Sequence, residues 1–348
     1  MTPPGSRRDG PGARPPPRGD RGAPDRAILF IQLGGPETLR DVPSFLYRLF
    51  SDPEVIRVRP ALLRKAIAAA IALARKRASR ALYASIGGGS PIRRLTEAQA
   101  SGAETLLNEG GARVTVRAAM TCSRPLVEDV VRELAAAGIR RFLALPLYPQ
   151  YSLTTTKGSL DRARAAVARF APGATLVEIG SWPTFPLFVE AHAALVREEI
   201  ARFPDPRPEA VHILYSAHSI PRKLVTREGD PYPEEVGASV RAINARLGDR
   251  SAWSLAYQSK LGPVEWLGPG TLETIQELGR QRKKQVLVVP IAFVTDHVET
   301  LYEVDQLFGD EARRAAIASF RRTPGLNDRP EFLRALADIA LSAQSFWS

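Results

Sequence analysis

The chain has 348 residues, of which 44% are hydrophobic, so it is long enough for two globular domains or one large α/β unit. Its formal net charge is +11, and residues 57–80 alone hold eight Lys and Arg residues and no acid. One basic segment without interleaved aromatic residues argues against a nucleic-acid binder. The single cysteine, Cys122, excludes an intrachain disulfide and a metal centre built from several cysteines of this chain.

Residues 1–25 are rich in Pro, Gly and Arg and contain no apolar run, which predicts a disordered tail rather than a signal peptide. No stretch supplies the roughly 18 uncharged apolar residues of a membrane span, and we expect a cytoplasmic location. Segment 57–80 carries an Ala-rich helical pattern for which two interpretations stay open. It is either a solvated helix or an amphipathic lip that contacts the anionic inner face of a membrane.

Eight short apolar runs are predicted as strands, with helical patterns between most of them. They cover residues 27–33, 113–119, 141–147, 174–180, 211–217, 252–258, 285–292 and 317–322. Most are apolar on both faces, as parallel strands covered by helices should be. The sequence therefore predicts an α/β fold of two similar doubly wound domains, each with a four-stranded parallel sheet. We expect these domains at 26–175 and 176–348, with the last helix packing back on the first.

Chemically rich loops follow several of the predicted strands, where doubly wound sheets bind their ligands. His218 comes directly after the strand at 211–217, and the stretch FVTDHVETLYEVD (293–305) follows the strand at 285–292. Judged by its neighbours alone, His218 is either a functional group or a strand-end histidine whose ring bonds a nearby carbonyl. Both interpretations stay open at this point.

The stretch 293–305 combines helix-start signals with an unusual density of acids. Asp296 as N-cap with Glu299 at N3 predicts an acidic capping box, and Glu299 and Glu303 share one helical face. Capping and a solvated acidic face would explain the acids, but they leave His297 and Tyr302 in the same turn unexplained. One acid cannot easily both cap a helix and point at a ligand, so we expect a distorted first turn.

Two glycine-rich stretches lack the spacing of nucleotide-binding loops. LGGPET (33–38) does not have the G-x-G-x-x-G pattern, and IGGGSP (86–91) lacks the Lys-Ser/Thr of a P-loop. We interpret both as tight turns or as close backbone approaches to a flat ligand.

Seven stretches, taken in chain order, resemble ferrochelatases, the enzymes that insert ferrous iron into a porphyrin. They are LGGPETLRDVPSFLYRLFSDPEVI (33–56), IGGGSPI (86–92), LPLYPQYS (145–152), YSAHSIPRKLVTREGDPYPEEV (215–236), YQSKLGPVEWLGP (257–269), VPIAFVTDHVETLYEVD (289–305) and PGLNDRPEF (324–332). The resemblance implies a class II chelatase fold with a cleft between two domains. It also implies insertion of Fe²⁺ into protoporphyrin IX to give protohaem, with Fe²⁺ as substrate and no permanently bound cofactor.

The resemblance further implies roles for individual residues. His218 matches the family's invariant active-site histidine and Glu299 its partner carboxylate, and we expect the two to bind metal and to face each other across the porphyrin plane. The predicted supporting residues, which would relay protons or metal, are Asp296, His297, Glu303 and Asp305. The predicted porphyrin-binding residues are Leu33, Tyr148, Ser259, Lys260, Trp266 and Phe293. Whether His218 acts as proton acceptor or metal ligand stays open.

The chain departs from the family at one place. Relatives usually have Met-Arg-Tyr where this chain has Met120, Thr121 and Cys122, and Arg124 is the expected substitute for the lost arginine. This departure leaves three alternatives open: protoporphyrin insertion, a chelatase for coproporphyrin III or another divalent metal, and a non-catalytic tetrapyrrole- or metal-binding protein. Some relatives carry a [2Fe–2S] cluster on four cysteines, which this chain cannot hold with one.

Overall fold

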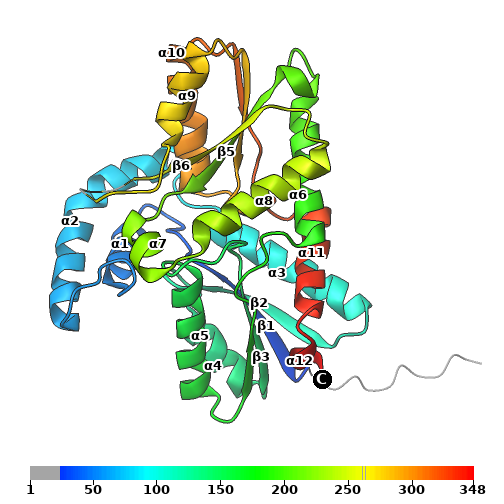
Figure 1. Ribbon diagram of the computed structural model, residues 1–348. Coiled ribbons are helices and arrows are strands. Elements are labelled where there is room, and N and C mark those ends of the chain that lie inside the picture. Colours follow the sequence, from blue (N-terminus) through cyan, green and yellow to red (C-terminus); the bar gives the residue numbers. More distant parts are fainter. Residues whose placement is uncertain (1–23, 261, 263) are drawn as a thin grey trace, which may run out of the picture.

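The computed structural model describes residues 24–260, 262 and 264–348, so nearly all of the tail predicted for residues 1–25 lies outside the described residues (Figure 1). Eight strands form two separate sheets of four parallel strands, in the orders β2-β1-β3-β4 and β6-β5-β7-β8. The two sheets have equivalent strand orders: in each half the first strand lies inside the sheet, between the second and the third. The prediction of two doubly wound units is confirmed.

The first sheet belongs to the N-terminal half. Its strands are β1 (Arg26–Gln32), β2 (Val114–Met120), β3 (Arg141–Pro146) and β4 (Thr175–Glu178). Its helices are α1 (Val42–Ser51), α2 (Ala61–Ser85), α3 (Ile92–Glu109), α4 (Val127–Ala136) and α5 (Thr156–Phe170). Residues 27–31 of β1 are fully buried, since helices cover both faces of the sheet. β4 ends three residues beyond the predicted domain boundary at 175.

The second sheet belongs to the C-terminal half. Its strands are β5 (His212–His218), β6 (Trp253–Gln258), β7 (Gln285–Pro290) and β8 (Ser319–Arg322). Its helices are α6 (Pro186–Ile200), η1 (Pro208–Ala210), α7 (Arg222–Glu228), α8 (Tyr232–Leu247), α9 (Thr271–Arg280), η2 (Glu299–Phe308), α10 (Gly309–Arg314), α11 (Pro330–Leu341) and α12 (Gln344–Trp347). All eight predicted strands are present, with ends that differ from the prediction by at most two residues.

One hydrophobic core runs through both halves. It joins Phe30 and Leu145 of the first sheet to Tyr215 and Ile291 of the second half. The chain end reinforces this union, because α11 packs on α3 and α6, and α12 contacts β3 and β4. The two sheets are therefore held in a fixed relation, with their strand ends on a shared interface.

Helices α1 and α2 pack against each other and stand out to one side of the molecule (Figure 1). α2 contains most of the basic segment 57–80. Within the described ranges, no helix is long and apolar enough to cross a membrane.

Candidate active site

The carboxyl ends of strands from both sheets border one cavity of about 140 Å³. Its walls are mainly apolar and come from the loops after β1, β3, β5 and β7. The lining residues are Gln32, Leu33, Gly34, Ile92, Leu147, Tyr148, Gln150, Ser152, Thr154, Thr155, His218, Ile220, Tyr232, Ala292, Phe293, Val294, Thr295, His297 and Glu299. Gly34 has a φ of +84°, and a Cβ there would collide with the Ser123 hydroxyl, which confirms a tight glycine turn at this wall.

His218 and Glu299 are joined by a hydrogen bond at this cavity. The distance from His218 Nδ1 to Glu299 Oε2 is 2.8 Å, and the imidazole is 37% exposed towards the cavity. The expectation that the two residues face each other across a porphyrin plane is wrong, because no macrocycle fits between atoms in direct contact. The two side chains instead form one hydrogen-bonded unit at the cavity wall.

The pair is electrostatically polarised. Burial lowers the pKa of His218, but the charge and hydrogen bond of Glu299 outweigh that effect and raise it above its usual value. Burial acts to raise the pKa of Glu299, and the cationic His218 outweighs it and lowers that pKa to about 2. An ionised Glu299 must accept from Nδ1–H, so the lone pair of neutral His218 lies on Nε2. The carboxylate thus orients the imidazole and strengthens it as a base.

Ser259 extends the pair into a chain of hydrogen bonds. Its Oγ lies 2.9 Å from Glu299 Oε2 and 2.7 Å from Glu303 Oε2. A hydroxyl has one proton to donate, so two ionised carboxylates cannot both be satisfied by it. Burial and the charge of Glu299 raise the pKa of Glu303 to about 7, so Glu303 holds a proton that it can donate to Ser259. The continuous order is His218, Glu299, Ser259, Glu303.

The backbone around this chain is unusual. η2 is a π-helix of ten residues that carries both glutamates, and Ser259 has a φ of +66°, in the left-handed region. Such conformations are uncommon for these residues and cluster at functional sites. Their effect here is to bring the two glutamates to one hydroxyl.

The predicted capping box is wrong, although the first turn is distorted as expected. Val298 is the residue before η2, and no side chain caps the helix. The carboxylate of Asp296 instead accepts hydrogen bonds from Arg322, Thr300, Gly325 N and Asn327. These four donors satisfy the buried acid better than one helical N–H would.

His297 supports the same cluster from inside the cavity wall. Its Nδ1 donates to Thr295 O at 3.0 Å, and its Nε2 lies 3.9 Å from Glu299 Oε1. Its ring packs on Phe293 with the centroids 4.5 Å apart. His297 is therefore fixed beside the outer oxygen of Glu299.

The other residues predicted for the site divide into two groups. Leu33, Tyr148 and Phe293 line the cavity, whereas Ser259, Lys260 and Trp266 do not. Lys260 points towards Glu273, with Nζ 3.6 Å from Oε1, and Trp266 forms a strand-like bridge with Pro221. Asp305 pairs with Arg322, together with Asp296 and apart from the His218 chain.

The residues at the family departure do not line the cavity either. Thr121 and Cys122 are both buried, and burial raises the pKa of the Cys122 thiol to about 11. Arg124 is exposed and pairs with Asp129 at 3.2 Å, so it does not replace an arginine at the cavity. The expectation that Arg124 takes that role is wrong.

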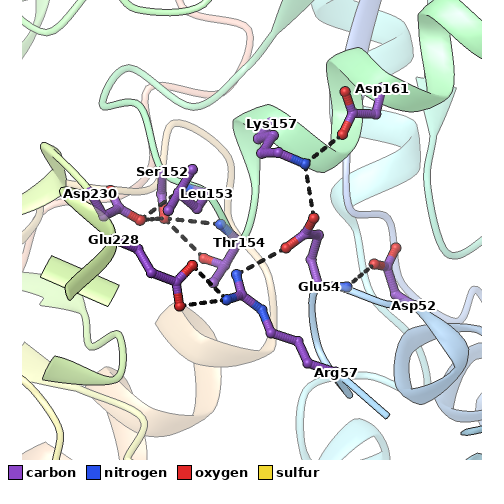
Figure 2. Close-up of polar contacts among 10 residues, drawn as sticks. All are labelled: Asp52, Glu54, Arg57, Ser152, Leu153, Thr154, Lys157, Asp161, Glu228 and Asp230. Atoms are coloured by element: carbon purple, nitrogen blue, oxygen red, sulfur yellow. Dashed lines mark hydrogen bonds and ion pairs between the residues drawn. The ribbon is translucent and has the colours of Figure 1, made fainter. Parts of the chain in front are cut away.

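A network of charges joins the two halves (Figure 2). Arg57 donates to both oxygens of Glu228 at 2.7 Å and to Glu54 at 3.0 Å, and Lys157 bridges Glu54 and Asp161. Three residues of the loop 152–155 line the cavity, and Leu153 of the same loop borders a second pocket together with Arg57 and Lys157 of the network. Asp230 holds the loop by accepting from Ser152 Oγ and Leu153 N at 2.9 Å each.

Two functional features escaped the sequence reasoning. The bridging role of Ser259 was missed, although its position directly after β6 is a signal of the same kind that identified His218. Arg322 was missed because it lies 26 positions from Asp296 in a strand that looked ordinary. Across the described ranges, no group of three or more His, Cys, Asp and Glu side chains is arranged to hold a metal ion.

Comparisons with known proteins agree with this geometry. The ferrochelatase family model matches residues 25–344. A ferrochelatase of Synechococcus sp. (strain JA-2-3B'a(2-13)) is 46% identical, covering 90% of this chain and 91% of that protein. A ferrochelatase of Thermosynechococcus vestitus is 44% identical, covering 92% and 83%.

Solved structures support the fold alone. SirB from Bacillus subtilis with Fe3+ has a TM-score of 0.54 and 12% identity, covering 92% of this chain and 95% of that chain. The sirohydrochlorin chelatase SirB from Bacillus subtilis subspecies spizizenii in complex with cobalt has a TM-score of 0.51 and also 12% identity, covering 92% and 96%. With the family match over most of its length, the chain belongs to the ferrochelatase family of metal-insertion enzymes.

Proposed function

We propose that the protein inserts Fe²⁺ into protoporphyrin IX to make protohaem, and that His218 and Glu299 carry the reaction. The observation that carries this proposal is the His218–Glu299 hydrogen bond of 2.8 Å at the wall of an apolar cavity. Fe²⁺ enters as substrate, and we propose no permanently bound cofactor. Apolar walls suit a flat macrocycle, and the polar pair supplies the chemistry at its centre.

The chemical task is to remove two pyrrole protons and admit the metal. Neutral His218, with its proton on Nδ1, offers Nε2 as the acceptor for a pyrrole proton. The imidazolium that forms is stabilised by Glu299, as an ionised acid stabilises the histidine of a hydrolase triad. An imidazolium cannot bind a metal, so base and ligand roles exclude each other within one step. We propose proton acceptance as the main role of His218, with the negative charge of Glu299 attracting Fe²⁺.

The first pyrrole proton must leave His218 before this residue can accept the second. The chain from Glu299 through Ser259 to Glu303 offers a route, because each member is within 2.9 Å of the next. Glu303 receives a proton through Ser259 only in its ionised form, which is present near neutral pH because burial and the charge of Glu299 raise its pKa to about 7. Asp296 and Asp305 have a weaker claim to a relay role, because Arg322 binds both.

The test is an anaerobic assay with Fe²⁺ and protoporphyrin, followed by the visible spectrum of haem. We expect His218→Ala and Glu299→Gln to lose about 100-fold or more in turnover, the usual scale of a lost general base, while porphyrin binding by fluorescence quenching persists. Glu133→Gln, at an exposed position of α4, is the matched control. Near-normal turnover of His218→Ala would refute the base assignment. Loss of binding in both variants would make them anchors.

The alternative substrate is coproporphyrin III, and the pair Thr121 and Cys122 argues against it. Both are buried and uncharged where relatives have Arg-Tyr, so this position supplies no positive charge to porphyrin carboxylates, of which coproporphyrin has more than protoporphyrin. Rates with protoporphyrin and coproporphyrin, each with Fe²⁺ and Co²⁺, decide between the candidates. Formation of a metalloporphyrin in any of these reactions also excludes a purely binding role.

We further propose that α2 contacts an anionic membrane surface from the cytoplasmic side. Leu62 and Leu73 are 80% and 64% exposed, and they lie among the Lys and Arg residues of segment 57–80. Apolar side chains beside basic ones favour the interface of anionic lipids. We expect co-sedimentation with phosphatidylglycerol vesicles but not with phosphatidylcholine vesicles, and loss of binding in a Leu62→Ser, Leu73→Ser variant. Equal binding of the variant would refute the proposal.

A further inference from the structure

Arg322, the last residue of β8, is a buried cation with an unusually full set of partners. Its side chain is 10% exposed. Nε and Nη2 donate to Asp305 Oδ1 and Oδ2 at 2.7 and 2.9 Å, and Nη1 donates to Asp296 Oδ1 at 2.8 Å and to Thr323 O at 2.9 Å. A buried guanidinium is tolerated only with such pairing. One side chain thus ties the second sheet to two points of the active-site segment.

The two aspartates lie on either side of the functional glutamates in the chain. Asp296 precedes η2, Asp305 lies within it, and Glu299 and Glu303 come between them. The other oxygen of Asp296 accepts from Asn327 Nδ2 at 2.8 Å and from Gly325 N at 3.1 Å. A Cβ at Gly325 would lie 2.8 Å from Asp296 N, so the loop after β8 closes tightly on this acid. The segment is held before and after its reactive residues.

A π-helix needs such support, because its wide turns are less stable than those of an α-helix and it is rarely longer than one turn. We propose that Arg322 is a positioning residue, which fixes η2 so that Glu299 meets His218 Nδ1 and Glu303 meets Ser259. Arg322 touches neither glutamate and acts through the backbone between the two aspartates. This inference rests on the proposed roles of His218 and Glu299, but it is testable without turnover.

The conservative substitution separates charge from geometry. In Arg322→Lys the positive charge stays, but one ammonium cannot pair bidentately with Asp305 and reach Asp296 at the same time. Arg322→Gln removes the charge as well. The matched control is Arg314→Gln, which breaks an exposed pair with Glu311 on the helix that continues η2. If the Arg322 variants do not fold, Asp305→Asn weakens the bidentate half alone and leaves Asp296 with its other donors.

The direct readout is the NMR signal of the His218 Nδ1 proton in protein labelled with ¹⁵N-histidine. The chain has four histidines, so assignment by substitution is feasible. We expect this signal to shift or broaden in both Arg322 variants and to be unchanged in Arg314→Gln. We also expect kcat to fall by about 10- to 100-fold, the scale of a misplaced reacting group, with porphyrin KM changed by less than about twofold.

Guanidinium ion added to Arg322→Gly is expected to restore part of kcat, and sodium ion at equal ionic strength is not. The proposal is overturned if both Arg322 variants lower the melting temperature but leave the His218 signal and kcat as in the native protein. If the signal moves and even His218→Ala keeps native turnover, the positioning role stands and the proposed function of the pair falls.

Discussion

Replacing Glu303 by Gln should stabilise the folded protein at alkaline pH while it slows metal insertion. Gln keeps the size of the side chain: its amide N–H can donate to Ser259, as the protonated carboxyl does, and its oxygen can accept from Gln258. It removes only the ability to ionise. The native carboxyl is held next to the ionised Glu299, so its own ionisation in the folded state is unfavourable.

The magnitude follows from the pKa difference between folded and unfolded states. Burial and the charge of Glu299 raise the pKa of Glu303 from 4.5 to about 7. The folded state therefore holds this proton more tightly, and the stability that it contributes is complete below about pH 4.5 and lost as the pH rises to about 7. A difference of this size corresponds to about 3 kcal/mol, and partial solvent access reduces the expected effect to about 2 kcal/mol.

The assay is urea unfolding of the native protein and of Glu303→Gln at pH 5 and pH 8, without metal or porphyrin. We expect the advantage of the variant in unfolding free energy to grow by about 2 kcal/mol between these pH values. Glu133→Gln, on the exposed face of α4, should show a constant difference. A constant difference for Glu303→Gln as well would show that Glu303 is not held in its protonated form, and it would remove the proton-holding step from the proposed relay.

Three further outcomes are expected. His192 is buried with neither ring nitrogen hydrogen-bonded to any described residue, and burial lowers its pKa to about 3. In the same urea assay, His192→Leu should stabilise the protein by about 1–3 kcal/mol at pH 8. The stabilisation should be larger at pH 5, because at that pH the unfolded native chain binds a proton at His192 and the folded protein does not. Arg57→Met should change the unfolding free energy by less than about 1 kcal/mol, as expected for an exposed ion pair. Porphyrin exchange measured by stopped-flow fluorescence should become faster in this variant, because the Arg57–Glu228 contact between the two halves is lost. Gly34→Ala should weaken porphyrin binding in a fluorescence titration, since its φ of +84° and the Ser123 hydroxyl leave no room for a Cβ.

Much of the fold is readable from the sequence, because buried parallel strands must be apolar on both faces. Runs such as residues 27–31 and 286–289 have no other stable environment, and the central strands follow from this requirement. The edge strands β4 and β8 are only partly buried, so their signal is weaker. Strand ends are less certain, since the last residues of a strand face loops and carry mixed signals. β7, predicted to reach residue 292, ends at Pro290 because a proline has no N–H for the ladder.

The sequence places His218 and Glu299 at strand ends, where the structure has a cavity, but it does not give their mutual geometry. The rule that ligands bind beyond strand ends identifies the loops of His218 and Glu299, because it depends only on strand order. Whether two side chains from such loops touch depends on the angle of η2, which local patterns do not encode. The expected separation across a macrocycle therefore became a direct bond of 2.8 Å.

Asp296 shows how a local signal loses to a distant partner. A capping box offers a carboxylate one or two backbone donors at a solvated helix end, and is worth about 0.5–2 kcal/mol. Arg322 is buried, and without Asp296 it would pair with Asp305 alone. Removing one partner of a buried ion pair costs about 3–5 kcal/mol. Because breaking this ion pair would cost more free energy than the cap contributes, Asp296 turns away from the helix start. The helix begins uncapped at Glu299, whose carboxylate accepts a hydrogen bond from His218 Nδ1.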